Sequence, residues 1–214
     1  MTNSTGKYKA GSNLRRLTSL SLLIALVVVL ACLGNFIKIG PVPISLTLCP
    51  IIIGAALYGP SAGALLGAVF GVVTIITGIM GWDGGTVMLL MEIHPVACIL
   101  ICIAKTTVAG WVAGIVYRAV SAKRSEVSEK YSGNSKLAVI LAGIVCPVVN
   151  TGIFIAGMLI FWKDTLASWA GGSNVVTFAL TGLAGVNFLV ELAINMVLAS
   201  AVTLIIKYAA GRRR

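Results

Sequence analysis

The chain has 214 residues, of which 58% are hydrophobic and only 10% are charged. Soluble globular domains carry about 25% charged residues, so this composition excludes a water-soluble globule and indicates a membrane protein. The net charge of +10 would suit a nucleic-acid-binding protein, but all of the 16 basic residues except Lys38, Lys105 and Lys163 fall in three short segments. That placement indicates a determinant of membrane topology, and we expect no nucleic-acid partner.

The apolar runs of the chain predict six membrane-spanning helices, each of which needs about 20 mostly apolar residues. In chain order they cover residues 17–37, 44–58, 61–80, 95–117, 137–162 and 176–207. The first run is read as a retained helix and not as a signal peptide, because it has no cleavage site before a polar domain and further spans follow. We therefore expect an all-α membrane protein with one integral domain, residues 1–214, and six transmembrane helices.

The three basic segments orient this domain in the membrane. An even number of spans places all three on the same side, and the excess of Lys and Arg marks that side as cytoplasmic. We expect both termini in the cytoplasm. The cytoplasmic parts are then the N-terminal tail 1–16, the polar loop 120–136 and the basic tail 208–214. Two outer loops precede the fourth and sixth spans, with the sequences "GWDGGTVMLLMEIH" and "WKDTLASWAGGSN".

The stretch from Gly40 to Gly71 is apolar, yet prolines and glycines interrupt it. It has no Lys-Ser/Thr pair after its glycines, which excludes a Walker-type phosphate loop. A lipid-facing strand with open edges is not tolerated in a membrane. We expect a short helix, a tight turn at Gly59-Pro60, and a second helix with Gly63, Gly67 and Gly71 at four-residue spacing. Such a ridge of small residues lets two helix backbones approach closely.

The same stretch, "VPISLTLCPIIIGAALYGPSAGALLGAVFG", resembles the substrate-binding S-components of energy-coupling factor (ECF) vitamin transporters. The resemblance is found in the length, the six spans, the Tyr-Gly-Pro turn and the glycine ridge, and its local signature covers about residues 39–71. It implies an S-component-like bundle in a prokaryotic plasma membrane that captures a vitamin or vitamin precursor from outside. It also implies a transmembrane coupling subunit and two ATPase subunits as partners.

The resemblance has two further implications for sites. The chain shows no nucleotide-binding motif, so we expect no cofactor of its own, with ATP used by the partner subunits. Family members commonly carry small residues four positions apart on the first span, where the coupling subunit docks. Ser21 and Ala25 have this spacing here, although an Ala-xxx-Ala pair is not present, and ordinary packing within the chain is the alternative reading.

Polar residues in the last three predicted spans form the candidate substrate site, because ionisable groups within a membrane are costly and mark functional positions. These residues are Lys105, Asn150, Asn187, Glu191 and Asn195. At about 1.5 Å per residue, Lys105, Asn150 and Glu191 lie roughly 20–24 Å from the cytoplasmic ends of their helices. Either Lys105 and Glu191 pair only to fix the helix registry, or these side chains line a cavity that opens outward.

Lysine within such a cavity favours a substrate carboxylate, which points to pantothenate, nicotinate or biotin before riboflavin or thiamine. Pantothenate is the preferred candidate. Trp82 and Trp169 lie near the predicted outer ends of spans, where they either belong to an aromatic belt or cover the substrate. His94, Cys98 and Cys102 share one helix face, but a single face seldom completes a metal site, so no metal is expected.

We predict a solute-binding transport subunit with no catalytic residues, not an enzyme. The first alternative is a stand-alone membrane carrier or channel for a small organic solute, against which the lack of a clear inverted repeat counts. The second is an intramembrane enzyme, for which no protease-like set of residues is evident.

Overall fold

The structure is a computed structural model that describes residues 4–36, 38–39, 42–43, 47–125, 134–183, 185, 188–195 and 197. Its elements are α1 (Ser4–Gly34), β1 (Lys38–Ile39), β2 (Val42–Pro43), α2 (Leu48–Tyr58), α3 (Pro60–Ile79), α4 (Thr86–Ile93), α5 (Pro95–Ser125), α6 (Asn134–Phe161), α7 (Lys163–Ala170), α8 (Val175–Phe178) and a π-helix (Ala179–Leu183). The all-α class is confirmed, apart from the antiparallel pair β1–β2, in which Lys38 lies opposite Pro43.

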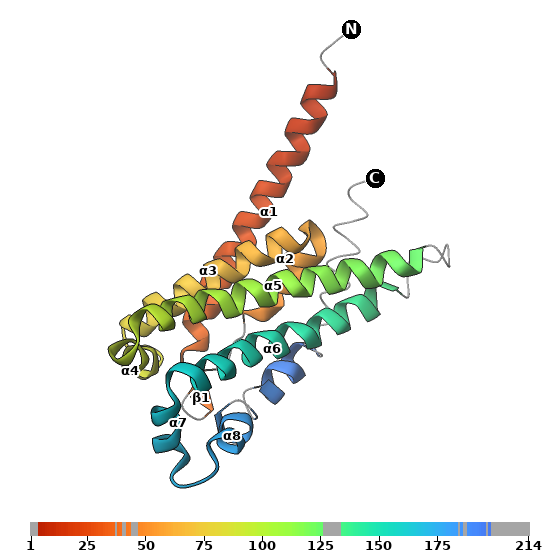
Figure 1. Cartoon of the computed structure of the whole chain (residues 1–214). Helices are drawn as coiled ribbons and strands as arrows, with labels where there is room; N and C mark the ends of the chain where they lie inside the picture. The colour runs from red at the N-terminus through yellow and green to blue at the C-terminus, as the bar shows by residue number, and fades with distance from the viewer. Residues whose placement is uncertain are drawn as a thin grey trace.

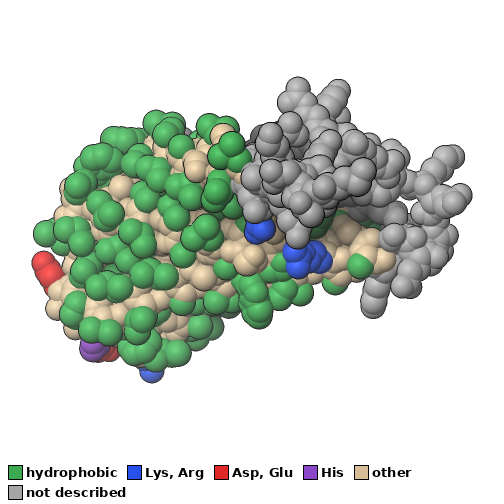
Figure 2. Space-filling model, turned by 90° about the horizontal axis from the view of Figure 1, so that it is seen from above, with side chains coloured by type: hydrophobic (Ala, Val, Ile, Leu, Met, Phe, Trp, Pro, Cys, Tyr) green, Lys and Arg blue, Asp and Glu red, His purple; other side chains and the backbone are tan. Residues whose placement is uncertain are grey.

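Within the described residues, four helices are long and apolar enough to cross a membrane. They cover Arg16–Gly34, Pro60–Ile79, Pro95–Ala122 and Lys136–Phe161. Helix α2 is apolar but has only 11 residues, in agreement with the short second span predicted from its flanking prolines. Hydrophobic side chains cover most of the described face in Figure 2, and charged side chains on it are few. The chain is therefore a membrane protein, whereas the count of six spans and the cytoplasmic termini stay predictions.

Helix ends differ from the predicted limits of the polar segments. Helix α1 begins at Ser4, so most of the predicted tail 1–16 is helical, and this part of α1 projects away from the bundle (Figure 1). The predicted loop 120–136 is also shortened, because α5 continues to Ser125 and α6 begins at Asn134. Loss of hydrophobicity marks where a helix leaves the lipid, but the backbone hydrogen bonds of a helix continue into water.

The two predicted outer loops each contain a short helix, α4 and α7. Helix α7 buries Leu166 and Ala170, and α4 buries Val87 and Leu90. Apolar residues at three- or four-residue spacing form one helix face, so each of these loops packs on the bundle through a short helix that the sequence analysis did not include.

The glycine ridge on α3 packs directly against the backbone of α5, as predicted. A Cβ atom added to Gly63 would overlap the Gly110 carbonyl, and one added to Gly67 would overlap the Thr106 carbonyl. At Gly71 the added atom would lie 2.7 Å from the Cys102 carbonyl oxygen. Only glycine permits this approach, which fixes α5 against α3.

The turn between α2 and α3 depends on Gly59 and Pro60. Gly59 has φ 96°, in the left-handed region that suits glycine, and its N–H donates to the Ala55 carbonyl. Pro60 occupies the first turn of α3, where its missing N–H leaves no helical hydrogen bond unmade. The turn therefore reverses the chain tightly enough for α2 and α3 to pack together.

Candidate functional site

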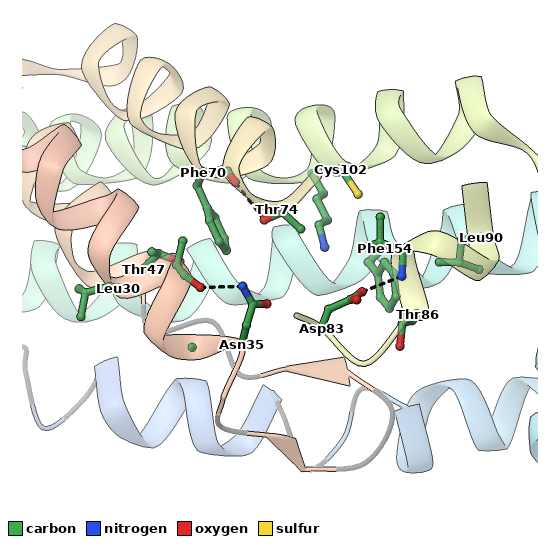
Figure 3. Close-up of a pocket in the computed structure, with 14 residues that line it drawn as sticks. Leu30, Asn35, Thr47, Phe70, Thr74, Asp83, Thr86, Leu90, Cys102 and Phe154 are labelled. Carbon is green, nitrogen blue, oxygen red and sulfur yellow. Dashed lines mark hydrogen bonds between the residues drawn. The ribbon is translucent and has the colours of Figure 1, made fainter. Parts of the chain in front are cut away.

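A cavity of about 70 Å³ lies where the end of α1, the start of α2, and helices α3 to α6 meet. Its lining residues are Leu30, Ala31, Gly34, Asn35, Thr47, Phe70, Thr74, Asp83, Thr86, Val87, Leu90, Cys102, Lys105 and Phe154. Figure 3 shows Asn35, Asp83 and Thr86 below the ring of Phe70, with side chains from several helices directed toward the same space. The lining is mostly apolar with a few polar groups, which is the usual composition of a small-molecule site.

Lys105 supplies the positive charge of this cavity. Its Nζ atom lies 4.7 Å from the centroid of the Phe154 ring on α6. A cation–π contact of this kind stabilises an ammonium group by about 0.5–2 kcal/mol, but the ring does not neutralise the charge. The positive charge therefore remains in a cavity that Asp83 also lines.

Asp83 supplies a carboxylate, which accepts hydrogen bonds from backbone N–H groups at the start of α4. Its Oδ1 accepts a hydrogen bond from the Gly85 N–H at 3.0 Å, and its Oδ2 accepts one from the Val87 N–H at 2.6 Å. These are N–H groups that a helix cannot satisfy in its first turn. A negative charge is also favourable at a helix N-terminus. Asp83 is only 4% exposed, although the sequence placed it in an open outer loop.

Helix α4 forms one wall of the cavity through Thr86, Val87 and Leu90. The Trp162 Nε1 donates to the Leu90 carbonyl at 3.0 Å, which ties α4 to the end of α6. Trp162 is buried, and its ring makes edge-to-face contacts with His94 and Phe161. This buried tryptophan therefore holds the wall in place.

The other predicted site residues lie outside the cavity lining. Asn150 on α6 is buried, and its Oδ1 has no hydrogen-bond partner within the described part of the chain. Glu191 and Asn195 are also buried, in the helical segment 188–195. A Cβ atom on Gly143 would lie 3.9 Å from the Cβ of Asn195, so this segment packs against α6. Asn187 lies outside the described residues. Of the four polar candidates that the structure describes, only Lys105 lines the cavity.

The two predicted tryptophans occupy different surroundings. Trp82 is 43% exposed, and its ring centroid is 6.1 Å from that of the exposed Phe36. Phe36 follows Asn35 in the sequence and Trp82 precedes Asp83, and both Asn35 and Asp83 line the cavity. Trp169 is partly buried and packs in the cluster around Met158, Trp162 and Leu166. Neither ring lines the cavity.

The predicted docking pair lies on the exposed side of α1. Ser21 and Ala25 are both exposed, and the Ser21 hydroxyl donates to the Leu17 carbonyl at 3.0 Å. Within the described residues no other helix covers them, and their role in docking stays a prediction. As for metals, within the described residues no group of three or more His, Cys, Asp or Glu side chains is arranged to hold an ion.

Sequence reasoning missed Asp83, Thr47, Asn35 and Phe154 as lining residues. For Asp83 a signal was present, because an Asp shortly before an apolar run is typical of a helix N-terminus. The other three are ordinary residues whose role depends on which helices meet.

The sequence matches the family described as "ECF transporter, substrate-specific component" over residues 15–206. This range includes the cavity, the glycine ridge and nearly all of the described helices. Among curated proteins, none matches the chain.

Proposed function

Because the chain belongs to the substrate-specific components of ECF transporters, we propose that it captures a vitamin or vitamin precursor bearing a carboxylate, with pantothenate as the preferred candidate. Lys105 forms the charge-assisted contact with that carboxylate. The protein acts as a multi-pass subunit of a prokaryotic plasma membrane and has no catalytic activity of its own. A transmembrane coupling subunit and two ATPase subunits complete the transporter.

The observation that carries this proposal is the ammonium of Lys105 in a mostly apolar cavity. Its described contact is the Phe154 ring, which leaves the charge in place. The nearby carboxylate of Asp83 already accepts two backbone N–H groups of α4. A charge within a membrane is costly, so such residues usually pair with another group or mark a functional site. An anionic substrate would supply the partner.

The cavity is small for a vitamin. About 70 Å³ holds a few water molecules, whereas ligand pockets usually enclose about 300–1,000 Å³. A vitamin therefore requires a wall to move.

Lys105→Met tests the proposal, and the matched control is Lys163→Met, at an exposed position of α7. Ligand-induced thermal stabilisation of the purified protein is measured with pantothenate, nicotinate and biotin. We expect wild type and Lys163→Met to be stabilised by the same acid. A hydrogen bond to a charged group contributes about 1.5–3 kcal/mol, so Lys105→Met should bind that acid about 10- to 150-fold more weakly. Equal affinity in all three proteins would refute the role of Lys105.

A further inference from the structure

Thr47, one of the residues that line the cavity, has a hydroxyl that makes no hydrogen bond within the described part of the chain. Thr47 is 0% exposed, and its Oγ1 has no hydrogen-bond partner within the described residues. A buried hydroxyl without a partner destabilises the protein that contains it. Such groups are rare in folded proteins, and each of them requires an explanation.

Helix capping does not explain this hydroxyl. Thr47 occupies the N-cap position of α2, but its backbone is helical (φ −77°, ψ −13°), and its side chain makes no capping bond. Asn174, at the start of α8, shows the ordinary arrangement: its backbone is extended and its side chain accepts from Val176 and Thr177 N–H groups. Thr74, another hydroxyl of the cavity, donates to the Phe70 carbonyl of its own helix at 2.9 Å.

The hydroxyl and the ammonium occupy different sides of the cavity. In Figure 3, Thr47 lies beside Leu30 and Asn35, whereas Phe154 and Leu90 lie on the other side of Phe70. The Lys105 Nζ is 4.7 Å from the Phe154 ring, which places the charge on that second side. The amide nitrogen of Asn35 donates to the Ala31 carbonyl at 3.0 Å and so holds a second polar side chain next to Thr47.

We propose that the Thr47 hydroxyl is a second recognition point, which binds a hydroxyl or amide group of the substrate at the end away from its carboxylate. This inference rests on the proposed function and narrows its substrate class to carboxylic acids with a polar, uncharged group at the other end. In Figure 3, Phe70 lies between Thr47 and the Phe154 ring that Lys105 contacts. A site with a buried polar group rejects analogues that cannot pair with it, because the group then stays unsatisfied.

The test compares two carboxylic acids that differ at the end away from the carboxylate. Pantothenate carries hydroxyl groups away from its carboxylate, and nicotinate carries none. Affinities for both are measured by calorimetry with wild type, Thr47→Val and Thr47→Ser. The matched control is Thr77→Val, since Thr77 is 3% exposed, donates to the Val73 carbonyl at 2.9 Å, and does not line the cavity.

We expect Thr47→Val to bind pantothenate about threefold to tenfold more weakly, the loss that corresponds to one neutral hydrogen bond. Its affinity for nicotinate should not change, and Thr47→Ser should behave as wild type does. The ligand-free Thr47→Val protein should melt at a higher temperature, because the variant removes an unsatisfied buried hydroxyl. Thr77→Val should leave both affinities unchanged.

Unchanged pantothenate affinity in Thr47→Val, or an equal loss for both acids, overturns the inference. The Lys105→Met variant in the same experiment separates this failure from that of the proposed function. Weaker binding in Lys105→Met with an unaffected Thr47→Val leaves the proposed function standing. If wild type binds neither acid, both proposals fail for this pair of substrates.

Discussion

Helix α5 has two different surroundings between Cys102 and Gly114. Its backbone lies directly against α3, where Gly63, Gly67 and Gly71 leave no room for a side chain. The side chains of Cys102 and Lys105 border a cavity with polar groups. The contact with α3 fixes the position of the helix, and the cavity side presents a charge at a defined place. A rigid support next to a site is what precise ligand recognition requires.

The largest effect is expected where the two backbones touch. In Gly67→Leu the new side chain meets the Thr106 carbonyl and the Thr107 Cα, so α3 and α5 must separate. Overpacking of this kind costs about 1–3 kcal/mol and occasionally more. The contact here is with backbone, so we expect the upper end of that range. The measurement is the thermal unfolding midpoint in detergent.

Gly152→Leu is the matched control for this substitution. Gly152 is an exposed helix residue with nothing within 4 Å of an added Cβ atom. This variant should unfold within a few degrees of wild type. Equal stability of the two leucine variants would contradict the tight α3–α5 interface.

A smaller effect is expected at the cavity, where the carboxylate of Asp83 holds the start of α4. Asp83→Ala removes both acceptors for the Gly85 and Val87 N–H groups. Loss of a helix cap costs about 0.5–2 kcal/mol. We also expect weaker solute binding, because α4 supplies Thr86, Val87 and Leu90 to the cavity wall.

Asp164→Ala is the control, because Asp164 is an exposed acidic residue in the first turn of α7. It should lower the unfolding midpoint by much less than Asp83→Ala. If both variants lose equal stability, the cap at Asp83 has no special importance.

The smallest effect on stability is expected on α1, outside both regions. Ser21→Leu and Ala25→Leu change exposed side chains, so each should alter the free energy of unfolding by less than about 0.5 kcal/mol. Both should nevertheless reduce co-purification with the coupling subunit and the ATPases, whereas Ser168→Leu on α7 should not. Normal assembly of both α1 variants would exclude this face as the docking surface.

The sequence predicts one part of the α3–α5 interface and one part of the cavity. Gly63, Gly67 and Gly71 predicted the close interface, because a four-residue spacing of small residues specifies one helix face by itself. Lys105 was found for a similar reason, since a charge within an apolar run stands out. Both signals are local to one helix.

The rest of the cavity depends on contacts between segments that are distant in the sequence, and sequence periodicity does not predict such contacts. Thr47 and Asp83 are polar residues beside helix ends, and their burial follows from how α2 and α4 pack on α3 and α5. Asn150 and Lys105 were predicted at similar depth, but depth does not determine which side of a helix faces the cavity. The helical segments α4 and α7 were missed because they are too short to give a clear apolar period.

The most direct test of the central claim is native mass spectrometry of the protein purified in mild detergent from cells grown with pantothenate, nicotinate and biotin. The account predicts that wild type retains one bound carboxylic acid, identified by its mass after release, and that Lys105→Met retains none while Lys163→Met does. Retention of the same acid by Lys105→Met at wild-type occupancy, or of an uncharged solute by all three proteins, would contradict it.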